Sequence, residues 1–490
     1  MINQTLYLQK HQPIIMTGQI SKSPSFLSGV LSTIKRSIRG EDIDLTTGSL
    51  RTAVVLLSIP MMIEMAMESV FALVDLYFVG HLEHSSFAIQ TVGLTESVLA
   101  VIYSLAIGLS MATTAVVARR IGEKKPTEAS RAGGQAIFIA LILNTTVSIL
   151  GVLYAKDILV LMGASQESAE HGKHFTQIMM GSSNFIMLLF LINGIFRGAG
   201  NAAIAMKSLC VANVINIILC PLLINGVGSF EGYGLTGAAI ATSIGRGSGV
   251  IYQVYHLTSE KHIIRIYLKY LKPKWAEVIS LCKIAGPAVM QFVIASCSWI
   301  FLAQLVAVTG ADEGSAGYQT ALRLMMFFML PAWGLSNAAA TLVGQNLGAG
   351  LVDRAEKAVF KTAKYNAIYM LTVTAISFAF ADILVSFFTN DLQVRMVAKQ
   401  AIYIMSSGYV LYGIGMVLIN AFNGAGDTQT PTWINLVGFW LFQIPLAHLL
   451  AKYFDLGPTG VFMAIPIAEG CITIAGIILF RKGKWKSVKV

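Results

Sequence analysis

The sequence predicts an all-α membrane protein with twelve transmembrane helices in two pseudo-symmetric six-helix lobes. Three observations lead to this fold class: a shortage of charge, a series of long apolar segments, and an internal repeat. Of the 490 residues, 55% are hydrophobic and 12% are charged, and the mean hydropathy is +0.68. Soluble domains typically carry about 25% charged residues. The chain therefore has too little charge to cover soluble domains of this total length.

The apolar segments are long enough to cross a membrane, which takes about 20 residues of helix. Twelve segments of this kind occur in the chain. They cover about residues 53–79, 87–118, 133–154, 174–197, 204–227, 236–257, 279–308, 315–344, 362–384, 400–422, 431–451 and 459–480. Twelve spans place both ends of the chain on the same side of the membrane.

Positive charge fixes the orientation, because Lys and Arg accumulate in cytoplasmic segments. With twelve spans and a cytoplasmic N-terminus, 28 of the 35 Lys and Arg residues lie inside and five lie outside. The other two, Arg246 and Arg323, fall within spans. We therefore predict a multi-pass protein of the cell (inner) membrane with both termini cytoplasmic.

The two halves of the chain carry the same motifs twice. Gly108–Gly122 resembles Gly334–Gly348, and Phe196–Asn201 resembles Phe422–Asp427, both at an offset of 226 residues. Two parallel repeats of six spans are typical of secondary transporters, in which the substrate path lies between the halves. The interpretation is a transporter and not a structural or assembly protein of the membrane.

The repeat also sets the expected domain organisation. A cytoplasmic tail (1–50) precedes an N-terminal lobe (51–256), a cytoplasmic interlobe linker (257–278), a C-terminal lobe (279–481) and a cytoplasmic tail (482–490). No phosphate-binding loop, catalytic triad or metal-binding cysteine pattern occurs, so we expect neither an enzyme nor a cofactor. The basic residues form no aromatic-rich stripe, which argues against nucleic acid as a partner. The lipid bilayer is the expected surrounding.

Acidic residues inside the first span are the strongest functional candidates. Glu64, Glu68 and Asp75 share one helix face at 100° per residue. Carboxylates at membrane depth are costly and are therefore read as functional, here in proton uptake or cation pairing. A buried structural network with Arg246 is the alternative. The repeat places Gln291, Ala295 and Leu302 at the equivalent positions, so the acids are concentrated in the N-terminal lobe.

Further residues are candidates of lower rank. Glu96 of the second span can join the acidic group as an accessory, while Glu469 of the last span is either a ligand or a structural hydrogen-bonding partner. Pairs of adjacent methionines can form an adaptable binding surface or ordinary packing. They are Met61–Met62, Met179–Met180 and Met325–Met326.

The chain resembles the multidrug and toxic compound extrusion (MATE) transporters over about residues 50–480. The motifs that carry the resemblance are Ser58–Pro60, Leu73–Asp75, Val79–Leu82, Phe196–Gly200, Asn216–Pro221, Gly237–Thr242 and Asn423–Asp427. The resemblance implies a monomeric antiporter that exchanges H⁺ or Na⁺ for amphipathic, often cationic, drug-like molecules by alternating access.

The resemblance also implies a cation site in the N-terminal lobe. Three of its four positions match here as Asp75, Asn216 and Thr242, whereas the fourth, an Asp in the family, is Cys220. Because hard cations prefer oxygen to sulfur, we expect H⁺ coupling through Asp75 rather than Na⁺ bound by Asp75, Asn216 and Thr242. The acidic positions of a second, C-lobe site are Ala295 and Tyr412 here, so that site is expected to be absent.

A lipid-linked precursor flippase of the same superfamily is the alternative function. Such a protein needs several basic residues in its cavity to hold pyrophosphate. The only cations expected within spans are Arg246 and Arg323, while acids dominate the first span. The sequence therefore favours cationic cargo.

Overall fold

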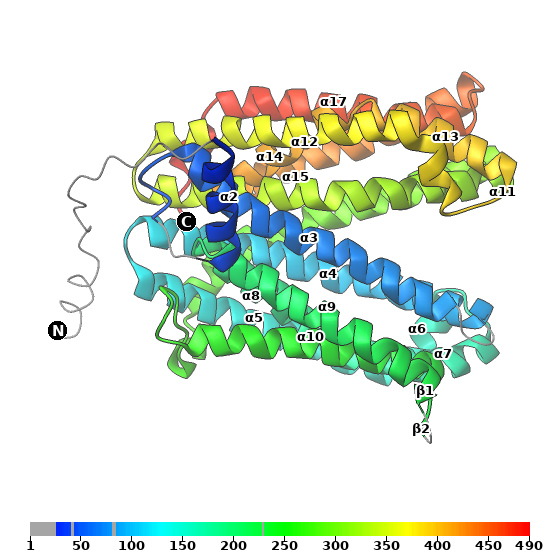
Figure 1. The fold of residues 1–490 in the computed structure, drawn as a ribbon, viewed down its shortest axis with the longest axis horizontal. Coiled ribbons are helices and arrows are strands. Elements are labelled where there is room, and N and C mark those ends of the chain that lie inside the picture. The colour runs from blue at the N-terminus through cyan, green and yellow to red at the C-terminus, as the bar shows by residue number, and fades with distance from the viewer. Residues whose placement is uncertain (1–25, 41–43, 81–84, 228–229) are drawn as a thin grey trace.

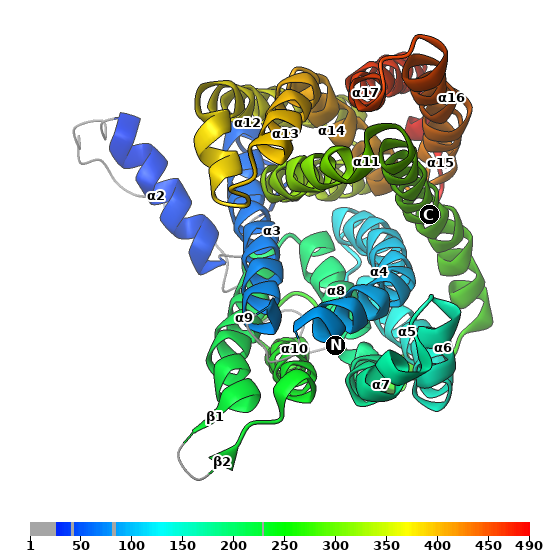
Figure 2. The same ribbon diagram turned by 90° about the vertical axis from the view of Figure 1, so that its right-hand side faces the viewer.

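The described part of the chain is a helical bundle with its helices roughly parallel to one long axis (Figure 1). The structure, a computed structural model, describes residues 26–40, 44–80, 85–227 and 230–490. A short helix, α2 (Phe26–Arg39), precedes the bundle, although residues 1–50 are predicted only as a tail. It crosses one end of α3 and projects sideways (Figure 2).

The N half contains the first six predicted spans. Its elements are α3 (Leu50–Gly80), α4 (Ser85–Gly122), α5 (Pro126–Leu153), α6 (Ala155–Leu161), α7 (Gln166–Gly181), α8 (Ser183–Gly198), α9 (Ala202–Asn225) and α10 (Gly234–Thr258). Two short strands, β1 (Gly226–Val227) and β2 (Phe230–Glu231), pair antiparallel between α9 and α10. The 3₁₀ helix η1 (Leu268–Leu271) lies in the connection to the second half.

The C half contains the other six. Its elements are α11 (Trp275–Gly348), α12 (Val352–Ser386), α13 (Leu392–Ser406), α14 (Tyr409–Ala425), α15 (Gln429–Asn435), the π-helix η2 (Leu436–Gln443), α16 (Ile444–His448), the π-helix η3 (Leu449–Tyr453), α17 (Pro458–Arg481) and the 3₁₀ helix η4 (Lys484–Ser487). The end of the bundle at which α2 and the C-terminus lie is called the tail end below (Figure 1).

The helices of the structure correspond to the twelve predicted spans. Among the described residues, nine helices are long and apolar enough to cross a membrane, and α13 with α14, bent by 55°, makes ten. The 74-residue α11 supplies two spans, because it breaks at Ala311, where φ is 52°. The twelfth is α10, whose glycines and Arg246 lower its hydropathy.

The structure alters several predicted boundaries. The fourth span begins at Gln166 instead of about 174 and is interrupted at Ser182 between α7 and α8. The tenth is divided between α13 and α14, and the seventh and eighth join at a kink without a loop. In each case polar or glycine residues break the helix inside an otherwise apolar segment, so that hydropathy alone does not locate the break.

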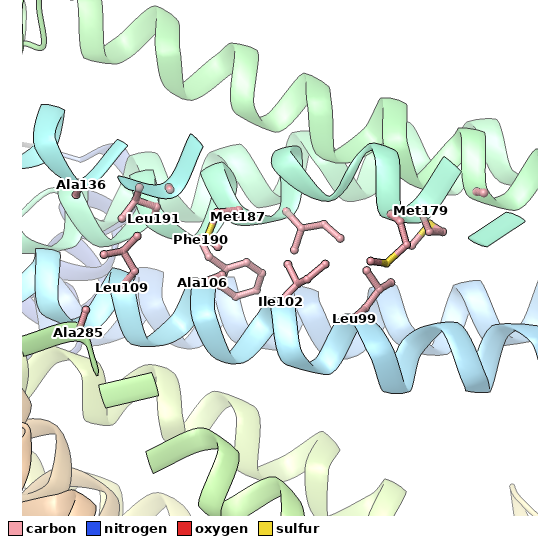
Figure 3. Close-up of a cluster of buried hydrophobic side chains, with 14 of the residues drawn as sticks. Leu99, Ile102, Ala106, Leu109, Ala136, Met179, Met187, Phe190, Leu191 and Ala285 are labelled. Atoms are coloured by element: carbon pink, nitrogen blue, oxygen red, sulfur yellow. The ribbon is translucent and has the colours of Figure 1, made fainter. Parts of the chain in front are cut away.

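The halves pack as two bundles side by side, with α3 and α4 of the N half against α11 of the C half (Figure 2). Within the N half, apolar side chains of α4 meet those of α7 and α8 (Figure 3). Leu99, Ile102 and Ala106 face Met179 and Phe190 in this cluster. Met179–Met180 is therefore ordinary packing, the second of the two roles considered for the methionine pairs.

The internal repeat appears in three dimensions as a reciprocal contact at the tail end. Gly122 of α4 lies against the main-chain oxygen of Gln345 of α11, and Gly348 of α11 lies against that of Arg119 of α4. Gly122 and Gly348, like Arg119 and Gln345, are 226 positions apart. Both positions need glycine because a side chain there would collide with main chain.

The last residues are packed against both halves and do not extend away as a tail. Trp485 is fully buried and stacks on Phe480, with ring centroids 4.6 Å apart. The guanidinium groups of Arg119 and Arg120 of α4 donate hydrogen bonds to the main-chain oxygens of Val488 (2.5 Å) and Val490 (3.2 Å). The segment after α17 therefore connects the C half to the N half at the tail end.

Candidate functional site

Glu64 lies in a buried ion pair within the N half. Its Oε1 accepts hydrogen bonds from Asn193 Nδ2 (2.9 Å) and from Arg197 Nη1 (3.2 Å), both on α8. Arg197 also donates to the Ser110 hydroxyl of α4 at 3.1 Å. The carboxylate is 1% exposed. Hydropathy places Arg197 at the cytoplasmic end of a span, and it does lie in the last turn of α8, with its side chain directed into the protein and 10% exposed.

Glu68 forms a second ion pair one turn further along α3. Arg246 of α10 donates two hydrogen bonds to its carboxylate, at 2.9 Å from Nη1 to Oε2 and at 2.6 Å from Nη2 to Oε1. The guanidinium carbon also lies 4.2 Å from the centroid of the Phe71 ring. Arg246 thus fills the space between a carboxylate and an aromatic face of the same lobe.

The polar group proposed for cation binding is only partly described. Asn216 Nδ2 donates to Thr242 Oγ1 at 3.2 Å, and both residues are buried. Cys220 is fully buried on the same helix as Asn216. Position 75 belongs to α3, but the Asp75 side chain lies outside the described residues. The structure therefore brings Asn216 and Thr242 together and leaves the acid of this site undescribed.

Glu96 is not part of the acidic group, contrary to one expectation from the sequence. Its side chain is exposed. Glu64 and Glu68 point instead into the N half, toward α8 and α10. The two acids therefore belong to the lobe interior, whereas Glu96 belongs to its surface.

In the C half an uncharged amide pair stands where the N half has its first ion pair. Gln291 Nε2 donates to Asn423 Oδ1 at 3.1 Å, and Asn423 Nδ2 donates to Gln291 Oε1 at 3.2 Å. Gln291 is equivalent to Glu64 at an offset of 227, and Asn423 is equivalent to Arg197 at 226. The repeat therefore conserves the contact while the charges are found in one half only.

A cavity of about 340 Å³ lies in the C half where it meets α4. Its wall is rich in aromatic and methionine side chains, with Ile107 and Met111 of α4 closing one side. The aromatic and methionine residues are Phe292, Trp299, Met325, Met326, Met329, Trp333, Tyr412, Met416 and Phe439. Met325–Met326 is thus in a position to bind a ligand.

Glu469 of α17 also lines this cavity and is the only charged group among the described residues that do so. It is 3% exposed, and its Oε1 accepts no hydrogen bond from the described residues. The two positions assigned to a C-lobe acidic site, Ala295 and Tyr412, line the same cavity. Sequence reasoning ranks Glu469 low because a single acid in a span gives no sign of whether it faces a cavity or a packed helix.

One family model matches each half of the chain separately. The MatE family model matches the chain twice, at residues 60–222 and 287–449, which are offset by 227. The chain belongs to the MatE family. Members of this family are transporters, so the MatE chain is a transporter and not an enzyme, as predicted. The double match confirms the internal repeat.

Relatives of this MatE chain align over most of its length. It is 25% identical to a Thermotoga maritima protein named as a probable multidrug resistance protein. The alignment spans 439 residues, which are 89% of this chain and 93% of that one. A multidrug export protein of Staphylococcus aureus is 23% identical over 424 residues, 86% of this chain and 91% of that one. A Shewanella oneidensis protein named as an FAD transporter is 27% identical over 418 residues, 84% of this chain and 90% of that one.

Solved MATE structures superpose on the whole bundle. One, described as an outward-facing conformation of a multidrug resistance MATE transporter, has a TM-score of 0.85 at 26% identity and covers 91% of this chain and 99% of its own. A MOP superfamily transporter from Pyrococcus furiosus, whose reversed pocket polarity is described as suggesting a different function, also has a TM-score of 0.85 at 26% identity and covers 91% of this chain and 99% of its own. These matches confirm the fold of two six-helix lobes.

Proposed function

We propose that the protein is a secondary active antiporter that exports amphipathic cationic compounds across the cell membrane in exchange for H⁺. The observation that carries the proposal is the cavity of about 340 Å³ between the C half and α4, with aromatic and methionine walls and one carboxylate. Apolar walls with few polar groups are typical of small-molecule sites, and methionine adapts to ligands of different shape.

The two halves support transport by alternating access. They share pseudo-equivalent helices, and at the tail end Gly122 and Gly348 bring α4 and α11 into main-chain contact. A close contact of this kind holds one end of the path shut, and separating the helices there would open it. Rocking of one repeat against the other is the usual motion in such transporters.

The coupling ion that we propose is H⁺, with Na⁺ as the alternative. Glu64 and Glu68 are already paired with Arg197 and Arg246, which leaves Asp75 as the acid of the first span for coupling. Beside Asp75, the described oxygens of the site are those of Asn216 and Thr242, since Cys220 supplies sulfur. Two side-chain oxygens and one acid form a sparse cage for a hard cation, whereas a proton needs only the acid.

Cationic cargo is favoured over the lipid-linked precursors of a flippase. Among the described residues that line the cavity, none is Lys or Arg, and Glu469 is acidic. A pyrophosphate group needs cationic partners. One relative is named as an FAD transporter, and FAD is also an anion. The negative charge of this cavity opposes such a cargo.

The orientation that we propose places the tail end in the cytoplasm. Arg119 and Arg120 lie there against the last residues of the chain, and Lys124 and Lys125 follow α4 at the same end, as expected for a cytoplasmic surface. We propose a monomer in the lipid bilayer of the cell membrane, with drug-like small molecules as its partners.

Efflux of ethidium from proteoliposomes under separately imposed pH and Na⁺ gradients tests the proposal. We expect transport driven by the pH gradient alone and abolished in Asp75→Asn. Transport that requires Na⁺ would replace H⁺ as the coupling ion. Transport of FAD or of a lipid-linked precursor, with no movement of ethidium under either gradient, would overturn the assignment of cationic cargo.

A further inference from the structure

The repeat relates Arg246 of α10 to Glu469 of α17. Gly234–Gly237 at the start of α10 and Gly457–Gly460 at the start of α17 correspond at an offset of 223. The same offset carries Arg246-Gly247 onto Glu469-Gly470. A buried arginine in one half is therefore replaced by a buried carboxylate in the other, at equivalent positions of the last helix of each lobe.

The partner positions differ in the complementary way. Glu68 of α3, which holds Arg246 through two hydrogen bonds, corresponds at an offset of 227 to Ala295 of α11. In the N half a carboxylate, a cation and an aromatic ring form one closed group, because Arg246 also lies over Phe71. In the C half the carboxylate is present on the opposite helix, and the described residues supply no cation to it.

When it is ionised, Glu469 is in a position that favours a cationic partner. A carboxylate buried without a partner at membrane depth is expensive, and pairing with a cation offsets that cost. The free space beside it is the cavity of about 340 Å³, in which Trp299, Trp333 and Tyr412 present aromatic side chains. Aromatic faces attract organic cations by about 0.5–2 kcal/mol in addition to the ion pair.

We propose that Glu469 is the residue that selects a flat, monovalent organic cation in the C half. Glu68 needs no such ligand, because Arg246 supplies its cation from within the N half. The ligand takes the place at Glu469 that Arg246 takes at Glu68, between a carboxylate and aromatic side chains. This inference rests on the proposed export of amphipathic cations and assigns the residue that recognises their charge.

Equilibrium binding to the purified full-length protein in lipid nanodiscs tests the inference without any ion gradient. The probes are N-methylacridinium, a permanent cation, and acridine at pH 8, a neutral molecule with the same three rings. We expect the wild type to bind the cation more tightly. Glu469→Gln should weaken N-methylacridinium binding by about thirtyfold, the size typical of losing one partner of a buried ion pair, and leave acridine binding within about twofold.

Two further variants distinguish a specific loss of cation binding in Glu469→Gln from a general disturbance of the fold. Ala295→Glu combined with Glu469→Arg rebuilds the ion pair of the N half, so it should fold, as judged by its melting temperature, and lose the preference for the cation. Glu313→Gln, an exposed acid of α11 outside the cavity, should bind both probes as the wild type does.

Binding and transport separate this inference from the proposed function. Unchanged N-methylacridinium affinity in Glu469→Gln, or a wild type that does not distinguish the two probes, would overturn the assignment of Glu469. Loss of cation preference in Glu469→Gln would support it even if no gradient drives transport. In that case the antiport mechanism would be wrong and the recognition site would stand.

Discussion

Arg197 and Glu64 form an ion pair inside the N half whose C-half equivalents, Asn423 and Gln291, form a neutral amide pair. Equivalent positions of the two halves thus form the same contact with charged side chains in one half and neutral side chains in the other. The charged contact costs desolvation of two charges and is stabilised by their attraction, and the neutral contact needs only hydrogen bonds.

We predict that Arg197→Met lowers the free energy of unfolding by about 3–5 kcal/mol, because it leaves the Glu64 carboxylate buried without its cation. The double variant Glu64→Gln/Arg197→Asn, which copies the C half, should recover most of that loss. Denaturation in detergent measures both. Equal losses in the single and double variants would show that the charges themselves, and not their pairing, hold this part of the fold.

The glycine contact at the tail end predicts a change of conformation. Gly122→Ala or Gly348→Ala places a methyl group against main chain and should force α4 and α11 apart there. Spin labels at Lys125 and Lys357, both exposed, should report a longer mean distance in a background without native cysteines. Gly286→Ala is the matched control, since its Cβ would meet open space. An unchanged distance in all three variants would mean that the contact does not keep this end closed.

The packed segment after α17 predicts protection from proteolysis. Trp485→Ala removes a fully buried side chain that stacks on Phe480, and should raise the rate of cleavage within residues 482–490 by more than about tenfold. Ser487→Ala, at an exposed position, should leave the rate unchanged. Limited proteolysis followed by mass spectrometry measures both. Equal rates in the wild type and Trp485→Ala would contradict the role of Trp485 in holding the segment.

Cys220 predicts the response of the N half to Na⁺. Cys220→Asp adds carboxylate oxygens on the same helix as Asn216, so NaCl should raise the melting temperature of this variant more than choline chloride does. Cys220→Ser, which adds oxygen without charge, should show a smaller effect. An equal Na⁺-specific rise in the wild type would mean that Asp75, Asn216 and Thr242 already bind the ion, and the preference for H⁺ would be wrong.

Several features of the candidate site are accessible from the sequence. The pattern of charges in apolar segments identifies Glu64, Glu68 and Arg246 as buried, and the structure places all three in ion pairs inside the N half. Glu96, predicted as a possible accessory of this group, is exposed on the surface of the lobe, because helical periodicity describes one helix and does not show which neighbour covers a given face. Arg197 escapes sequence reasoning because a residue near a predicted span end can lie in a loop or in the helix.

The sequence by itself determined the membrane class, the twelve spans and the twofold repeat, because these follow from hydropathy and self-similarity along the chain. Only the tertiary structure decided which charges meet. It paired Glu64 with Arg197 and Glu68 with Arg246, and it left Glu469 facing a cavity. Partners of this kind come from helices more than a hundred positions apart, so their pairing depends on how the helices pack, a property that no local pattern contains.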